Sequence, residues 1–223
     1  MTLSKAEEDY LKALFHLNVE SDQKESRSGL LAEYLDVSQA SVNSMLKKLK
    51  KKELVAFERY GKVKLTANGE RIAVQLIRKH RLWETFLYQH MNFSWDEVHE
   101  VAEQLEHIRS KKLITELDKF LGLPKYDPHG AIIPSAEGHY ELLPKITLSS
   151  LKAGDICRIV SVKDSSVAFL QYVSKIGLAL SSQIIVVEIQ EFDQSMVINF
   201  EDNSLTVSKK FADNVFVECI PKP

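Results

Sequence analysis

The chain has little cysteine and no long apolar run. Its two cysteines, Cys157 and Cys219, form no Cys-x-x-Cys pair, so we expect reduced packing residues rather than a thiolate metal site. No stretch approaches the roughly 18 consecutive apolar residues of a membrane span. Residues 1–8 contain no apolar signal region. We therefore expect a cytoplasmic protein with no membrane partner.

Positive charge is concentrated in one part of the chain. Residues 24–81 carry fourteen Lys and Arg against six Asp and Glu, a local charge of +8, although the whole chain has a net charge of −2. The remaining residues must therefore sum to −10. This split favours a nucleic-acid-binding module joined to a module that attracts cations.

A polar helix face without Lys or Arg is the most informative pattern. Residues 99–107 read H-E-V-A-E-Q-L-E-H, which places His99, Glu103, Glu106 and His107 on one arc of a helix. An ordinary solvated face mixes charges of both signs, whereas like charges repel unless a cation binds them. Another His-x-x-x-Glu pair occurs at residues 80–84. Together these residues are too many ligands for one tetrahedral site and predict two divalent-metal sites, and a solvated face is the alternative.

The N-terminal residues follow the order of a winged helix-turn-helix, that is, three helices and a hairpin. The signals are a capping box of Ser4 and Glu7, a short helix near residues 30–35, a helix capped by Ser38, and strands at residues 55–59 and 63–65. The helix capped by Ser38 should enter the major groove, and its Lys-rich end should contact phosphates. Arg59, Lys62 and Lys64 should lie on the hairpin, which forms the wing. The predicted DNA-binding residues are Arg27, Ser38, Gln39, Ala40, Ser41, Asn43, Ser44, Lys47 and Lys48.

The remainder of the chain predicts two further domains. Thr66 and Ser94 each cap a predicted helix, and the helices of this part end near residues 90, 107 and 121. After a Pro- and Gly-containing loop, short β-rich runs follow at residues 155–163, 183–190, 196–200, 205–208 and 216–220, with a helix near residues 167–176. We therefore predict a mainly α protein with β: a DNA-binding domain (1–66), a helical domain (67–143) and a small β-barrel (144–223).

Four motifs together resemble the diphtheria-toxin-repressor/manganese-transport-regulator family of metal-dependent transcriptional repressors. The motifs are E-D-Y-L at residues 8–11, K-H-R-L-W-E at 79–84, the run at 99–107 and D-P-H-G-x-x-I-P at 127–134. The C-terminal β-rich part is similar to the SH3-like domain of the longer family members. The resemblance implies a homodimer that binds double-stranded operator DNA, with residues 67–143 supplying dimerisation and metal binding.

The resemblance also implies two metal sites per subunit. The primary site would be formed by Asp9, Glu103, Glu106 and His107, and the second by His80, Glu84, His99 and, from the SH3-like domain, Asp164. Short manganese-type members have Glu where this chain has Lys12, a departure that favours two separated sites over a closely bridged pair. We expect His129, a loop residue beside Pro and Gly, to be structural or exposed.

The donor set predicts the metal, and the motifs argue against an enzyme. Three carboxylates and one imidazole suit Mn(II) or Fe(II). We therefore predict a non-enzymatic repressor of manganese or iron homeostasis genes that is activated by one of these ions. A helical di-metal enzyme would need two Glu-x-x-His motifs, which are absent. A winged-helix regulator of a non-metal ligand is the other alternative.

Overall fold

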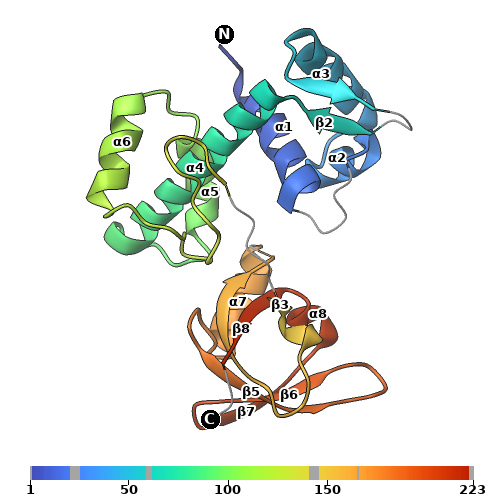
Figure 1. Ribbon diagram of the computed structural model, residues 1–223, viewed down its shortest axis with the longest axis vertical. Coiled ribbons are helices and arrows are strands. Elements are labelled where there is room, and N and C mark those ends of the chain that lie inside the picture. The colour runs from blue at the N-terminus through green and yellow to red at the C-terminus, as the bar shows by residue number, and fades with distance from the viewer. Residues whose placement is uncertain (1, 21–25, 59–61, 141–145, 165, 221–223) are drawn as a thin grey trace. The chain divides into compact units, whose positions relative to one another are not determined.

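The chain forms two compact units in a computed structural model, which describes residues 2–20, 26–58, 62–140, 146–164 and 166–220 (Figure 1). The first unit contains Met1–Trp83, Ala102–Lys125 and Ile133–Leu142, and the second contains Glu84–Val101, Tyr126–Ile132 and Leu143–Pro223. Among the described residues, no helix is both long and apolar enough to cross a membrane.

The first unit begins with the predicted winged helix-turn-helix. Its elements are α1 (Lys5–Phe15), η1 (His16–Glu20), α2 (Ser28–Tyr34), α3 (Gln39–Lys51), β1 (Val55–Phe57) and β2 (Val63–Leu65). The capping box is formed: the Ser4 N–H donates to Glu7 Oε2 at 2.8 Å, and the Glu7 N–H donates to Ser4 Oγ at 3.3 Å. Ser38 caps α3 by accepting a hydrogen bond from the Ser41 N–H.

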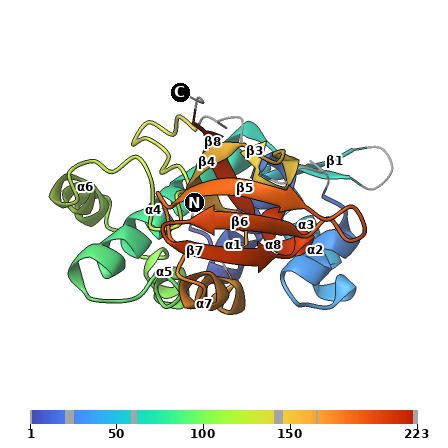
Figure 2. The same cartoon turned by 90° about the horizontal axis from the view of Figure 1, so that it is seen from below.

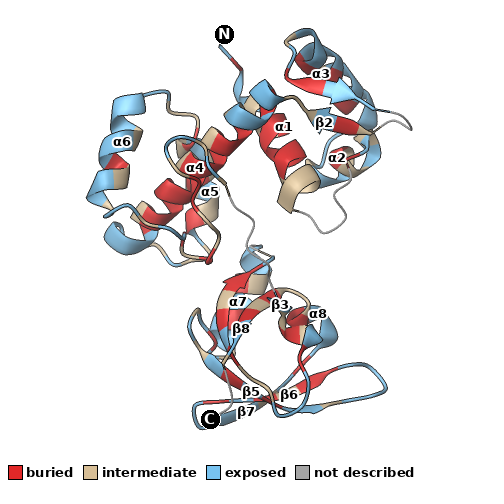
Figure 3. Cartoon of the chain, in the orientation of Figure 1, coloured by how far each residue is buried: buried red, intermediate tan, exposed pale blue. Residues whose placement is uncertain are grey.

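One apolar core packs α1, α2, α3 and the start of α4 (Ala67–His90) together (Figure 3). The core residues with no more than 1% exposure include Leu11 and Leu14 of α1, Leu46 and Leu49 of α3, and Ile77 of α4. Their spacing of three or four residues puts them on one face of each helix. As a result the opposite face of α3 is left on the surface.

The helix predicted to end at His107 is shorter than expected. α5 spans Val98–Leu105 and does not begin at Ser94, whose hydroxyl instead binds Glu97 in a preceding turn. The Glu106 N–H still donates to the Ala102 carbonyl, at 2.9 Å, so helical hydrogen bonding extends to Glu106. Glu106 and His107 therefore lie in the turn between α5 and α6 (Lys111–Phe120).

A six-stranded antiparallel sheet with order β3-β8-β4-β5-β6-β7 forms most of the second unit. Its strands are β3 (Ile146–Thr147), β4 (Ile156–Val162), β5 (Gln183–Ile189), β6 (Met196–Phe200), β7 (Asn203–Val207) and β8 (Val215–Cys219). Figure 2 shows β5, β6 and β7 side by side. The predicted SH3-like, β-rich C-terminal part is confirmed.

The helices of the second unit are short. Those that follow Leu143 are η3 (Leu148–Ser150), α7 (Val167–Lys175) and α8 (Lys209–Ala212). The sequence predicted α7 but neither β3 nor α8, because segments of two to four residues are too short to show periodicity. Alternate residues of the strands, such as Ile184, Val186 and Ile198, are completely buried, so one face of the sheet forms the core.

Candidate metal centre

Three predicted ligands meet in the first unit. Asp9 lies on α1, and Glu106 and His107 lie in the turn after α5. His107 Nε2 is 3.2 Å from Asp9 Oδ1 and 3.8 Å from Glu106 Oε1. One ligand atom of each residue lies within 4.8 Å of the others. Folding therefore brings together donors that are almost a hundred residues apart in the sequence.

Two of these donor atoms are buried without a hydrogen bond. Asp9 Oδ1 and His107 Nε2 have no hydrogen-bond partner among the described residues. Burial also raises the pKa of Asp9, although the charges of His107 and Lys12 act in the opposite direction. A buried carboxylate oxygen without a hydrogen bond is costly, and a bound dication would remove that cost. This cluster of oxygen and imidazole donors fits a divalent cation such as Mn(II) or Fe(II).

A residue that the sequence analysis missed orients His107. The ring atom Nδ1 lies 2.5 Å from Glu8 Oε2, so the ring N–H donates to this carboxylate. Such a bond directs the unprotonated Nε2 toward Asp9 and Glu106, as required of a metal ligand. Glu8 neighbours Asp9 in the E-D-Y-L motif, but its different role follows only from the helical direction of its side chain.

Lys12 lies against the other two carboxylates. Its Nζ is 2.8 Å from each oxygen of Glu106 and forms a further ion pair with Glu103. His80 Nδ1 is 2.6 Å from Glu106 Oε2. Burial opposes ionisation of Glu106, but the hydrogen bond from His80 and the charge of Lys12 lower its pKa to about 2. Thus Glu106 is an anion shared between the metal-ligand cluster and Lys12.

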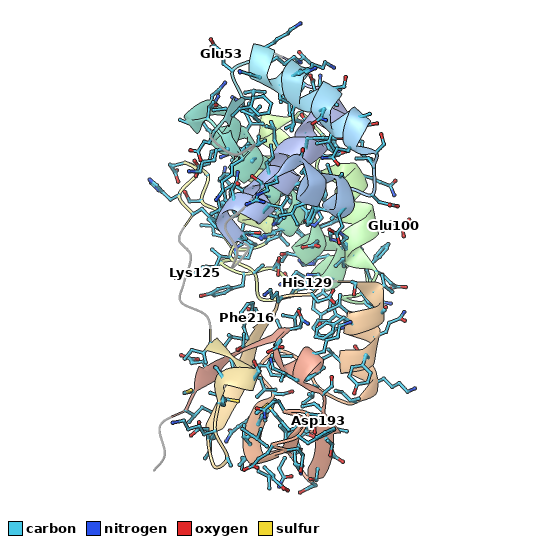
Figure 4. All side chains as sticks on the ribbon, turned by 90° about the vertical axis from the view of Figure 1, so that its right-hand side faces the viewer. Glu53, Glu100, Lys125, His129, Asp193 and Phe216 are labelled. Atoms are coloured by element: carbon cyan, nitrogen blue, oxygen red, sulfur yellow. The ribbon has the colours of Figure 1, made fainter. Side chains whose placement is uncertain are left out.

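A second cluster of three buried side chains lies in the second unit. His129 Nδ1 is 3.7 Å from Glu84 Oε2 and 4.0 Å from Asp127 Oδ1. The other ring atom, Nε2, lies 2.7 Å from the Trp95 carbonyl, to which it donates (His129 is labelled in Figure 4). Nδ1 therefore faces the carboxylates of Glu84 and Asp127. Because an unprotonated Nδ1 and a carboxylate are both acceptors, this arrangement requires a proton on Nδ1 or a metal ion bound by Nδ1 and the carboxylates.

His129 is thus not an exposed loop residue. It is 4% exposed, and burial lowers its pKa while Glu84 and Asp127 raise it, with a net value of about 9. The turn is held by Asp127 Oδ1, which accepts from the N–H groups of His129 and Ala131. The Asp-x-His spacing of Asp127 and His129 in the loop was the one signal for this cluster in the sequence. Glu84 could not be assigned to it, because it is distant in sequence.

The histidines predicted for the second metal site each contact a carboxylate. His99 Nδ1 lies 3.2 Å from Glu84 Oε1, whereas His80 contacts Glu106 in the first unit. Asp164 follows β4 and accepts a hydrogen bond from the Ser166 N–H at 2.8 Å. The Val162 N–H, near Asp164 in the chain, donates to the His129 carbonyl at 3.1 Å.

The predicted DNA-reading face is on the surface. The exposed residues of α3 and its cap are Ser38, Gln39, Ala40, Ser41, Asn43, Ser44, Lys47 and Lys48. Some of these side chains have local partners: Ser38 caps α3, Gln39 Nε2 donates to Ser28 Oγ, and Lys48 lies 3.3 Å from Glu7. Arg27, also exposed, precedes α2, and the predicted wing residue Arg59 lies outside the described residues.

Three family models match consecutive parts of the chain. Residues 2–63 match the iron dependent repressor N-terminal DNA binding domain, residues 66–135 the iron dependent repressor metal binding and dimerisation domain, and residues 146–219 the FeoA domain. These matches run in the order of the DNA-binding helices, the metal-ligand turn and the C-terminal sheet.

Individual relatives are similar to parts of the chain. The chain is 31% identical over 120 residues to the HTH-type transcriptional regulator MntR of Oceanobacillus iheyensis, covering 54% of this chain and 80% of that protein. It is 30% identical to the diphtheria toxin repressor of Corynebacterium jeikeium over 61% of this chain and 56% of that protein. It is 43% identical over 70 residues to a probable metal transport system membrane protein of Chlamydia trachomatis, covering 31% of this chain and 16% of that protein.

A solved structure covers nearly the whole fold. A manganese-dependent transcriptional repressor in complex with manganese superposes with a TM-score of 0.88 at 32% identity, covering 96% of this chain and 100% of the other. The chain therefore belongs to the family of metal-dependent transcriptional repressors that includes the diphtheria toxin repressor and MntR.

Proposed function

We propose that the protein is a transcriptional repressor that binds operator DNA when Mn(II) or Fe(II) occupies the cluster of Asp9, Glu106 and His107. The observation that carries this proposal is the pair of buried atoms, Asp9 Oδ1 and His107 Nε2, which face each other at 3.2 Å without a hydrogen bond. Glu103 is the fourth proposed ligand, and its carboxylate is shared with Lys12.

The position of the cluster supports a coupling between metal binding and DNA binding. Asp9 belongs to α1, whose apolar face packs in the same core as α3, whereas Glu106 and His107 follow α5. A bound dication would hold these segments together and limit the positions of α3, the proposed recognition helix. Shifting a two-state equilibrium from 1:99 to 99:1 requires about 5.5 kcal/mol of differential binding.

We propose a homodimer that binds two operator half-sites. The reading helices of such a dimer lie about 34–36 Å apart, one turn of DNA. Asn43 and the small polar residues at the start of α3 would contact base edges, while Lys47 and Arg27 would contact phosphates. The three-domain division at residues 66 and 143 and a cytoplasmic location remain predictions. So does the absence of an enzymatic activity.

A second metal site is proposed around Glu84. The buried donors Asp127 and His129 support a site with Glu84 there, and Asp164 is retained as a further ligand. The assignment of His80 and His99 to this site remains a prediction, and the contact of His99 with Glu84 supports it for His99. The donors are again carboxylate and imidazole, which suit the same class of ion.

The test is DNA binding by metal-depleted protein with and without added Mn(II) or Fe(II), at stated salt concentration. The DNA consists of genomic promoter fragments selected with the metal-loaded protein. We expect tight binding only with metal, and loss of that response in His107→Ala. The matched control is His139→Ala, because His139 is exposed and outside both clusters. Equal binding with and without chelator would refute the proposal and favour a regulator of a non-metal ligand.

A further inference from the structure

Lys12 places a positive charge inside the proposed metal centre. It lies on α1 three residues after Asp9 and is only 8% exposed. Its ammonium group contacts both oxygens of Glu106, at 2.8 Å each, and one oxygen of Glu103. An ammonium group has three N–H donors, and these three oxygens can accept all of them. The side chain is therefore fully engaged with two proposed metal ligands.

We propose that Lys12 is a built-in cation of the metal centre: it holds Glu103 and Glu106 toward α1 before metal binds, restricts the centre to one dication, and weakens the binding of that dication. This inference rests on the proposed function. It adds a residue that sets the metal affinity and stoichiometry, and hence the metal concentration at which the protein responds.

The charge balance supports a single dication. The three proposed ligands Asp9, Glu103 and Glu106 contribute three negative charges, and Lys12 contributes one positive charge. The charges of these four side chains therefore sum to −2, which equals the charge of one bound dication in magnitude. A second dication bridging Glu103 and Glu106 would have to take the oxygens that Lys12 occupies. Without Lys12 the same carboxylates would carry one more uncompensated charge, which favours binding of cations.

The contacts also explain how the centre remains assembled without metal. Lys12 belongs to α1, while Glu106 follows α5, so the ion pair joins the two segments that the dication is proposed to join. Removing one partner of a buried ion pair leaves the other charge uncompensated and destabilises the fold. Lys12 should therefore stabilise the metal-free protein and compete with metal in the same place.

The test is calorimetric titration of the full-length, metal-depleted protein with Mn(II). For Lys12→Met we expect the dissociation constant at this centre to decrease at least tenfold, and the metal-free melting temperature to fall. Added Mn(II) should reverse that fall. Lys12→Glu should bind one more Mn(II) per chain than the wild type. The matched control is Lys111→Met, which removes an exposed lysine of α6 and should change neither quantity.

Lys12→Arg keeps the charge and should retain the wild-type stoichiometry, which provides a second readout if Lys12→Met does not fold. Folded Lys12→Met with unchanged or weaker Mn(II) affinity would overturn the inference alone, as would unchanged stoichiometry in Lys12→Glu. A wild-type protein that binds no Mn(II) would instead overturn the proposed function as well.

Discussion

Glu8 and Asp9 contact opposite nitrogens of the same imidazole. Glu8 Oε2 lies 2.5 Å from His107 Nδ1, and Asp9 Oδ1 lies 3.2 Å from His107 Nε2. Adjacent residues at the start of α1 thus have different roles, since one carboxylate orients the ring and the other faces it as a proposed co-ligand. The first turn of α1 is in this way part of the proposed metal centre.

Glu8→Gln should weaken Mn(II) binding without removing a ligand. The amide cannot stabilise the ring N–H as a carboxylate does, so His107 becomes a poorer and less well oriented donor. Loss of such a partner costs about 10- to 100-fold in metal affinity. Calorimetric titration measures this change, and Glu116→Gln, at an exposed carboxylate of α6, is the control. An affinity equal to that of the wild type would show that Glu8 does not support the ligand.

Glu7 should make the DNA-binding helices sensitive to acid. Its carboxylate is 1% exposed, accepts from the Ser4 N–H and lies 2.6 Å from Lys52 Nζ. Burial alone would raise the pKa of Glu7, but Lys52, Ser4 and Lys48 lower it from 4.5 to about 2. A lowered pKa in the folded state means that this stabilisation is present above pH 4.5 and is lost as the pH falls toward 2.

Glu7→Gln should therefore reduce the free energy of unfolding at pH 7 by about 1.5–3 kcal/mol, the usual contribution of hydrogen bonds to a charged group. The difference from the wild type should shrink as the pH falls from 4.5 toward 2. Urea unfolding at a series of pH values measures it, and Glu33→Gln, an exposed residue of α2, is the control. A difference that does not vary with pH would contradict this assignment.

Gly130 should tolerate no side chain. Its φ is +77°, and a Cβ atom would lie 2.0 Å from the Val160 carbonyl oxygen and 2.8 Å from Ser161. Gly122 has a similar φ of +74° but open space around it, which makes it a matched control. Gly122→Ala should cost about 1–2 kcal/mol from the backbone conformation alone.

Gly130→Ala should cost clearly more than Gly122→Ala and should displace the His129 turn. Urea unfolding gives both costs, and Mn(II) titration of Gly130→Ala reports on the Glu84, Asp127 and His129 cluster. Equal costs for the two alanine variants would mean that the loop can move away from β4 without penalty.

Lys47 should contribute to DNA affinity without selecting a sequence. It is exposed on α3, whereas neighbouring Lys48 also contacts Glu7. Lys47→Ala should weaken binding to operator and non-operator DNA alike and reduce the slope of log K against log salt by about 1. Fluorescence anisotropy over a range of salt concentrations measures the slope, with Lys112→Ala of α6 as control. An unchanged slope would place Lys47 away from the phosphates.

Local signals in the sequence were sufficient for most of the elements. The Ser4 and Glu7 capping box, the Ser38 cap and the Thr66 cap predicted helix starts correctly, because each depends on side chains that bind backbone groups within three residues. Alternating residues predicted β4 to β8 to within two residues. The end of α5 at Leu105 was missed, since a turn can keep helical spacing for a few residues after the helix ends.

The sequence by itself determined the chemistry of this protein: carboxylates and imidazoles without thiolates, a positively charged reading helix, and the order of helices before strands. These properties belong to residue types and short spacings. Only the tertiary structure decided which donors meet. It paired Glu8 with His107, inserted Lys12 between Glu103 and Glu106, and buried His129 beside Glu84. Such contacts depend on how distant segments pack, because a metal-sized cluster needs atoms within a few ångströms that the chain separates by up to about a hundred residues.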